Sequence, residues 1–451
     1  ASDVYQRQPN YFAPAYFDPA DIGARVMPGS RYTNDDRYTK NNHELRISTD
    51  PEKSVRGMIG LFTQKQYHDF EQHWIVEGIS PVLWPDQDNP GNEAFRDTVY
   101  LNSLYRTDYD DAIFGSVDFD IGDRTTLTLG ARFFEPEVNV IGFFGFGEPY
   151  TRGDAGGTNY PAPFNLWGGS GEVQCDLVEG DPGWTPKFNG RENYREQPCL
   201  NVDKTQKESD SVFRVNLARD LGDDSMIYVT WSEGYRPGGV QRNPLAGSYV
   251  SDFLTNYEFG WKAQFADNTF QLNGAAFHQE WDDIQVSFTG ENAITAVNNG
   301  PTAEVDGIEV DMIWLPSDNL RITAAAAWYD TELTDDYCNF TAGVCTEVLA
   351  PKGTALPTTA DFKGNIVARY TFPVGRFDAY VQGAVAYNGE RSGDLDTTLY
   401  DEPDEAERLA LIKSLPSWTT VDVSVGFRSD SWGMDLFVTN LTDEDAPLYV
   451  T

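Results

Sequence analysis

Residues 421–428 read VDVSVGFR, and this stretch predicts the fold of the chain. Every second residue from Val421 to Phe427 is apolar, and the residues between them are Asp, Ser and Gly, followed by Arg428. Because successive side chains of a strand point to opposite faces, the stretch predicts a strand with one apolar and one polar face. The same alternation recurs at 126–133, 212–219, 362–371 and 377–388.

Short turn-forming stretches separate paired runs of this kind. They are rich in Asp, Gly, Asn and Pro, the residues that tolerate the backbone angles of hairpin corners. We expect about fourteen strands in seven hairpins. The seven predicted turns lie at 49–53, 122–124, 222–225, 266–268, 316–319, 373–375 and 429–431.

The connections at the other end of the strands are long and irregular. They lie at about 67–110, 143–208, 237–254, 289–301, 333–358 and 390–416. Short turns at one end, long loops at the other, and strands that are apolar on one face indicate an all-β, transmembrane, antiparallel up-and-down β-barrel. We expect an irregular segment over 1–40 that enters the barrel and a partial barrel over 41–451, with the short turns periplasmic and the long loops extracellular. A soluble β-sandwich is the alternative, but it would not need this asymmetry between the two ends.

The composition limits which classes of partner and which kinds of membrane segment are expected. The 451 residues include 71 acidic and 33 basic side chains, for a formal charge of −38, which disfavours nucleic acid. The longest apolar stretches, such as 322–328, fall short of the roughly 18 residues of a membrane helix. The first residues, ASDVYQRQPN, lack the features of an export signal.

Four cysteines fall into two local pairs, Cys175 with Cys199 and Cys338 with Cys345. Each pair lies in a polar, Gly- and Asp-rich segment, which predicts loop-closing disulfides in an oxidising compartment. A metal site is the rival interpretation. Neither pair has the CxxC spacing typical of zinc sites, and no His lies close in sequence.

Four stretches resemble one family when they are taken in order. They are YVTWSEGYRPGGVQRN (228–243), TNYEFGWKAQFADNTFQLNGAAFHQEWDDIQV (255–286), VDGIEVDMIWLPSDNLRITAAAAWYD (305–330) and MDLFVTNLTDEDAPLY (434–449). They are similar to the C-terminal two thirds of the barrel of a TonB-dependent outer-membrane receptor. The resemblance implies a plugged barrel of 22 strands, of which the strands here would be the eighth to the twenty-first. On that plan the plug, the energy-coupling box, the first seven strands and the last strand are not in this sequence.

The resemblance also implies a location and a function. The location is the outer membrane of a Gram-negative cell, in contact with lipid and lipopolysaccharide. The function is uptake of a scarce ligand, driven through the plug by the inner-membrane TonB complex, and a ferric siderophore is the first choice because the Tyr-Arg-Pro-Gly-Gly corner at 235–239 occurs in members that resemble iron receptors. Oligosaccharide, cobalamin and haem remain alternatives. Outside this family, a passive channel of fourteen strands closed on itself and a structural or adhesive barrel also remain.

The same corner supplies the candidate ligand-binding residues. Trp231, Tyr235 and Arg236 would mark the outer rim, where basic and aromatic groups can meet an anionic chelate through charge-assisted hydrogen bonds and stacking. The simpler interpretation is a rim corner in which Arg236 pairs with a nearby carboxylate such as Glu233.

Other motifs predict no chemistry. His68 and His73 are five residues apart, so neither a strand nor a helix places both on one ion, and we expect no metal site there. The acidic clusters at 108–111, 334–336 and 401–407 could bind loop-bound Ca²⁺, but solvated loop charge is the favoured interpretation. No nucleophile elbow, Cys-His pair or dinucleotide fingerprint is present, so we expect no enzyme and no cofactor.

Overall fold

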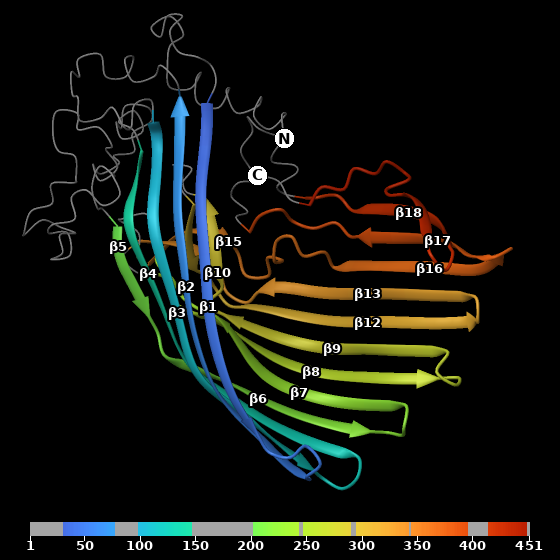
Figure 1. The fold of residues 1–451 in the computed structure, drawn as a ribbon. Coiled ribbons are helices and arrows are strands. Elements are labelled where there is room, and N and C mark those ends of the chain that lie inside the picture. The colour runs from blue at the N-terminus through green and yellow to red at the C-terminus, as the bar shows by residue number, and fades with distance from the viewer. Residues whose placement is uncertain are drawn as a thin grey trace, which may run out of the picture.

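The computed structural model describes residues 30–76, 98–146, 202–242, 247–289, 295–341, 344–395 and 414–448. Fourteen strands follow one another in a single antiparallel path through one curved sheet, and a fifteenth, β5 (Val202–Lys207), pairs with β4 beside that path (Figure 1). All seven predicted turns join neighbouring strands of the path, which confirms the expected hairpins. Among the described residues, no helix is long and apolar enough to cross a membrane.

The first four strands are long and form what we call the tall wall. Each has 19 to 23 residues, about twice the roughly 9–11 residues that cross a bilayer, so their upper ends project beyond the membrane. These strands are β1 (Ser30–Ser48), β2 (Val55–Val76), β3 (Thr98–Asp120) and β4 (Thr125–Phe146).

The other ten strands of the path are shorter and form the short wall. Apart from β19, they have 11 to 15 residues. They are β6 (Asp210–Asp220), β7 (Ser225–Arg236), β8 (Asp252–Phe265), β9 (Phe270–Asp282), β12 (Ala303–Ser317), β13 (Leu320–Leu333), β16 (Phe362–Val374), β17 (Phe377–Asn388), β18 (Trp418–Arg428) and β19 (Gly433–Val438).

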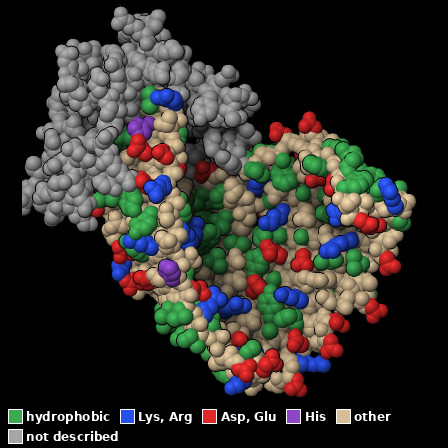
Figure 2. Space-filling model, viewed as in Figure 1, with side chains coloured by type: hydrophobic (Ala, Val, Ile, Leu, Met, Phe, Trp, Pro, Cys, Tyr) green, Lys and Arg blue, Asp and Glu red, His purple; other side chains and the backbone are tan. Residues whose placement is uncertain are grey.

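The predicted apolar and polar faces are both present. Side chains such as Leu61, Phe133, Val229 and Ile308 are exposed and lie on one face, which is the lipid-facing, outward face of such a wall. Charged and amide side chains alternate with them on the inward face, and Figure 2 shows Lys, Arg, Asp and Glu on the hollowed side. Across the described residues the path ends at β1 and β19, which are its two edges, so these residues do not form a fourteen-stranded barrel closed on itself.

Several expected loop boundaries are wrong. Residues 30–40 belong to β1 rather than to an irregular segment, and β2 and β3 extend into the range 67–110. The acidic cluster at 108–111 therefore lies within β3, where Asp108 pairs with Arg106 and Asp110 with Arg132. The strands continue because their upper inward face packs a core of its own instead of facing water.

The remaining long connections also contain strands. β4 and β5 extend into 143–208, β8 begins inside 237–254, one hairpin overlaps 289–301, and another lies within 333–358. These hairpins are β10–β11 (Gln285–Thr289 and Thr295–Asn299) and β14–β15 (Tyr337–Thr341 and Val344–Ala350). The predicted Cys338–Cys345 disulfide closes β14–β15, whereas Cys175, Cys199 and the acidic cluster at 401–407 lie outside the described residues.

Two small cores stabilise the extracellular end. One packs on the tall wall and is formed by Tyr100, Leu104, Val138, Val140, Phe144, Val202 and Val240. The other joins the connections of the short wall and is formed by Ile284, Ala303, Leu333, Tyr337, Leu349, Ala350 and Leu395. The extracellular side of the molecule is therefore a packed structure above both walls.

Candidate functional site at the extracellular rim

The Tyr-Arg-Pro-Gly-Gly corner opens a segment that links the two walls, and we call its described residues, 236–242 and 247–251, the strap. Arg236 ends β7 and lies opposite Asp252, the first residue of β8. Asp252 is only 1 % exposed, and Arg236 donates to its carboxylate through Nε at 2.9 Å and through Nη2. A guanidinium and a carboxylate in this two-point geometry form a strong, directional ion pair.

Three further donors complete the environment of Asp252. The indole Nε1 of Trp281 donates to it at 3.0 Å, as do the backbone N–H groups of Gln285 at 3.3 Å and of Arg236 at 3.2 Å. The Arg236 guanidinium also lies over the Trp281 ring, 4.9 Å from its centroid. A buried carboxylate needs this full set of donors, so Arg236 holds the corner together.

The expected partner of Arg236 is therefore corrected. Glu233 accepts a hydrogen bond from the backbone N–H of Phe213 at 3.0 Å, and the carboxylate that pairs with Arg236 is Asp252, sixteen residues away. Sequence proximity favoured Glu233, but antiparallel pairing of β7 with β8 brings Asp252 opposite Arg236.

The two glycines of the corner permit a close backbone approach. Gly239 exchanges two backbone hydrogen bonds with Tyr249, at 2.9 and 3.0 Å, which closes the strap on itself. A Cβ on Gly238 would lie 2.5 Å from the carbonyl oxygen of Tyr249, so no larger residue fits there without movement. Glu208 accepts from the backbone N–H groups of Gly238 at 3.2 Å and Ser251 at 3.1 Å and so ties both ends of the strap to the segment that follows β5.

The strap is also tied to the β10–β11 hairpin, which lies between β9 and β12 in sequence. Gln241 accepts from the backbone N–H of Val297 at 3.1 Å, and Asn299 accepts from that of Val250 at 2.8 Å. Gln285 donates from its side chain to the carbonyl of Pro237 at 3.0 Å. The strap is therefore a folded bridge with defined contacts on both sides.

The middle of the strap lies over the inward face of the tall wall. Val240 is buried in the core that contains Tyr100 and Phe144, and Arg242 follows two residues later. The Arg242 guanidinium lies 5.5 Å from the centroid of the Phe144 ring. Burial raises the pKa of the Tyr100 phenol to about 12 and raises that of the Tyr32 phenol, and the nearby Arg242 charge acts against both pKa shifts.

Arg242 has no ion pair with any carboxylate in the described part of the chain, although the chain carries a formal charge of −38. Its surroundings are the aromatic rings of Tyr32, Tyr100 and Phe144, with Tyr32 41 % exposed. Sequence reasoning missed this residue and selected Arg236, six positions earlier in the same motif. Nothing in the sequence marks which of the two arginines has a carboxylate partner.

The other two predicted site residues lie in different places. The Tyr235 ring stacks on that of Phe134, with centroids 3.5 Å apart and planes within 7°, and is thereby fixed against the tall wall. Trp231 lies opposite Tyr257 in the register of β7 and β8, on the same face as the exposed Val229. Trp231 is therefore an outward-facing residue, and the structure does not bring it together with Arg236.

The chain matches a known family over nearly its whole length. Residues 2–441 match the family described as TonB dependent receptor-like, beta-barrel. Two curated relatives are a pesticin receptor of Yersinia enterocolitica, 31 % identical over 98 residues, and a probable TonB-dependent siderophore receptor of Acinetobacter baumannii, 23 % identical over 199 residues. These matches cover 21 % and 40 % of this chain and 14 % and 26 % of the relatives.

Solved structures show the same fold. The ferric yersiniabactin uptake receptor of Yersinia pestis matches with a TM-score of 0.65 at 15 % identity, over 94 % of this chain and 52 % of that receptor. The ferric-catecholate import receptor of Escherichia coli matches with a TM-score of 0.58 at 13 % identity, over 93 % and 52 % of the two chains. This chain thus spans about half the length of these solved receptors. It belongs to the TonB-dependent receptor β-barrel family, whose members are transport receptors of the Gram-negative outer membrane and not enzymes.

Proposed function

We propose that this chain forms most of the barrel of a receptor that takes up a ferric siderophore across the outer membrane. The observation that carries the proposal is Arg242, a rim cation without an ion-pair partner among the described residues, held by the strap beside exposed Tyr32. On a strongly acidic protein, an unpaired guanidinium attracts an anion to its own position on the surface. A ferric chelate with negatively charged oxygen ligands offers that anion.

The chemistry of the rim suits such a chelate. A guanidinium forms charge-assisted hydrogen bonds with carboxylate or catecholate oxygens, at roughly 1.5–3 kcal/mol each. The Tyr32 ring offers an apolar face and a phenol at the same place. A tyrosine phenol is protonated at neutral pH, and burial raises the pKa of Tyr32 further, so this group can donate a hydrogen bond without adding negative charge.

The relatives support the same ligand class. The solved receptors with this fold include one described as a ferric yersiniabactin uptake receptor and one as a ferric-catecholate import receptor, and one curated relative is described as a siderophore receptor. Transport by this chain would need the plug and the TonB complex of its family, because a chelate bound tightly enough to be captured at low concentration does not leave unaided. The outward apolar face of both walls would contact lipid.

Uptake by cells tests the proposal. A strain that lacks the native gene is complemented with the full-length receptor and given iron-55 complexes of a triscatecholate, a trishydroxamate and a hydroxycarboxylate chelator, with and without a protonophore. We expect uptake of an anionic complex that the protonophore abolishes. Uptake of haem, cobalamin or an oligosaccharide in place of every iron complex would contradict the proposal, as would uptake that is independent of energy.

A further inference from the structure

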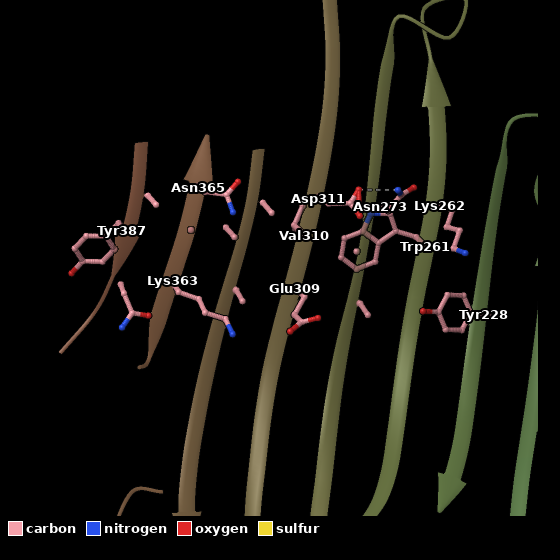
Figure 3. Close-up of a pocket in the computed structure, with 18 of the residues that line it drawn as sticks. Tyr228, Trp261, Lys262, Asn273, Glu309, Val310, Asp311, Lys363, Asn365 and Tyr387 are labelled. Carbon is pink, nitrogen blue, oxygen red and sulfur yellow. Dashed lines mark hydrogen bonds between the residues drawn. The ribbon is translucent and has the colours of Figure 1, made fainter. Parts of the chain in front are cut away.

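A recess of about 590 Å³ lies in the short wall, well below the strap (Figure 3). Its lining follows two adjacent register rows that cross the strands from β8 to β18. One row contains Lys262, Asn273, Asp311, Ala325, Asn365 and Ala386, and the other contains Ala275, Glu309, Ala327, Lys363, Asn388 and Trp418. Lys262 is ten residues from Asp252 along β8, or about 33 Å at 3.3 Å per residue, so the recess is separate from the rim.

Small side chains open the recess. The run 324–327 is four alanines on β13, and Ala325 and Ala327 from this run share the recess with Ala275 of β9 and Ala386 of β17. Where one strand carries alanine at positions that its neighbours fill with longer side chains, the wall is hollowed. A volume near 590 Å³ falls within the roughly 300–1,000 Å³ of small-molecule sites.

Two lysines line the recess without a counter-ion. Lys262 on β8 and Lys363 on β16 are both exposed, and neither forms an ion pair with a carboxylate in the part of the chain that the structure describes. The Lys363 ammonium lies 4.8 Å from the centroid of the Tyr329 ring, a contact that leaves its hydrogen-bond donors available. Figure 3 shows both lysine side chains at the recess, with Asn365 beside Lys363 on β16 and Tyr387 on the neighbouring strand.

The two carboxylates of the recess are held by neutral donors. Glu309 accepts from the hydroxyl group of Tyr329, and Asp311 accepts from the side-chain amide of Asn273 at 2.8 Å. Neutral side chains, and not the two lysines, therefore satisfy these carboxylates. With two ammonium groups and two carboxylates, the recess has no net charge, yet it presents two free cationic donors.

We infer that this recess is a second station for the cargo, where the negatively charged oxygens of a ferric chelate bind Lys262 or Lys363 on the way through the barrel; the inference rests on the proposed function. Free ammonium donors attract such an oxygen, while Glu309 and Asp311 limit its affinity. A conducting path needs sites that are favourable enough to enter and weak enough to leave. A recess with paired positive and negative charges meets that requirement better than a purely basic one.

Variants of the full-length receptor in the outer membrane test the inference. They are Lys262→Gln, Lys363→Gln, the double variant, and Lys65→Gln as the matched control, a lysine of the tall wall whose ammonium lies over the rings of Tyr67 and Tyr109. The probes are the iron-55 triscatecholate complex, which carries three negative charges, and an uncharged iron-55 trishydroxamate complex. Binding to cells is measured at 4 °C and the initial uptake rate at 37 °C.

We expect the double variant to bind the triscatecholate complex as the wild type does and to take it up at least about tenfold more slowly, since a lost charge-assisted hydrogen bond is worth about one factor of ten or more. Lys65→Gln should behave as the wild type, and the double Lys→Arg variant should retain uptake. An unchanged rate overturns the inference, as does an equal loss for the uncharged complex. Binding and uptake that fall together also overturn it, because the lysines would then seat another part of the folded receptor. If the wild-type receptor binds neither complex, the proposed function itself fails, and this outcome is distinct from the others.

Discussion

The tall wall and the short wall are parts of one sheet, but they differ in whether their inward-facing charged side chains form ion pairs. In the tall wall the guanidinium groups are matched with carboxylates: Arg56 donates to Asp120 at 2.8 Å, Arg106 pairs with Asp108 at 2.7 Å, and Arg132 pairs with Asp110 at 2.9 Å. Arg236 at the rim of the short wall pairs with Asp252, but five inward-facing cations below it form no ion pair with a described carboxylate. They are Arg214, Lys262, Arg321, Lys363 and Arg369.

The carboxylates of the short wall explain the difference. Glu258 accepts from the hydroxyl group of Tyr228 at 2.6 Å, and Asp435 accepts from that of Tyr380 at 2.7 Å. Neutral donors satisfy these carboxylates, so the cations stay available. These arginines of the tall wall are thus neutralised by carboxylates, whereas the short wall presents donors toward the interior of the barrel.

The largest predicted effect is at the joint between the walls. Asp252→Ala removes the acceptor of Arg236, of the Trp281 indole N–H and of the Gln285 backbone N–H, and should destabilise the strap by about 3–5 kcal/mol. Hydrogen exchange of residues 237–242 and 247–251 should rise steeply. The matched control is Asp223→Ala in the exposed β6–β7 turn, which should have no effect. Unchanged protection of the strap in Asp252→Ala would show that the contacts of Asp252 do not hold the strap in place.

The core of the tall wall comes next. Leu104 is 1 % exposed and packs in the extracellular core, so Leu104→Ala should cost about 3 kcal/mol through lost burial and the cavity that remains. Leu221→Ala, at an exposed turn of the short wall, should cost far less. Thermal unfolding of the purified receptor measures the loss of stability in both variants. Equal shifts in Tm would contradict the distinction between the packed core of the tall wall and the exposed turn of the short wall.

The disulfide of the β14–β15 hairpin gives an effect of intermediate size. Reduction of Cys338–Cys345 opens a seven-residue separation, and loop entropy predicts a loss of about 2.5 kcal/mol for the β14–β15 hairpin. Proteolysis should become faster at 337–350 and remain unchanged in the strap. Faster cleavage of the strap after reduction would mean that the two regions unfold together.

Replacing one glycine in each wall should show that the two walls are packed equally tightly at these positions. In the tall wall a Cβ on Gly60 would lie 2.4 Å from the ring of Phe114, and in the short wall a Cβ on Gly260 would lie 2.1 Å from the ring of Tyr228. Both Gly→Ala variants should cost about 2 kcal/mol through overpacking. Gly383→Ala, which meets nothing within 4 Å, should be nearly neutral. A neutral Gly260→Ala would show that Tyr228 moves aside freely.

The last predicted effect is absent at neutral pH and appears only above about pH 8. Burial lowers the pKa of the Lys204 ammonium to about 8, while an unfolded lysine titrates near 10.5. The unfolded form therefore binds more protons between these values, so stability of the β4–β5 pair should rise from about pH 8 to pH 10.5 and be flat below pH 8. Hydrogen exchange of residues 202–207 at a series of pH values measures this dependence of stability on pH. Lys204→Met should remove this dependence, and a rise that persists in the variant must come from another group.

The repeating parts of the fold were predictable, and the irregular parts were not. Alternation and turn chemistry located all seven hairpins, because these signals are local and repeat along the chain. The bounds of the long loops were wrong at 67–76 and 98–110, because these strand ends carry polar residues such as Gln72 and Asp108. In sequence they read as loop, and only the packing of their other residues under Val240 makes them strands.

The candidate site shows the same limit. The motif at 235–239 was correctly located at the rim, but the ion pair of Arg236 depends on Asp252, whose position opposite it follows from strand register. Whether an arginine has a partner is a property of the folded chain, so Arg242 could not be distinguished from Arg236. The recess at Lys262 and Lys363 joins residues 101 positions apart and left no signal in the sequence.

Binding of the iron-55 triscatecholate complex to the intact receptor, compared between Arg242→Gln and Arg376→Gln, tests the central claim most directly. Arg376 is a cation over the Phe377 ring at the turn end of the barrel, so it controls for loss of charge alone. We expect a Kd raised about 10- to 100-fold in Arg242→Gln and unchanged in Arg376→Gln. Equal affinity of Arg242→Gln and the wild type would contradict the central claim.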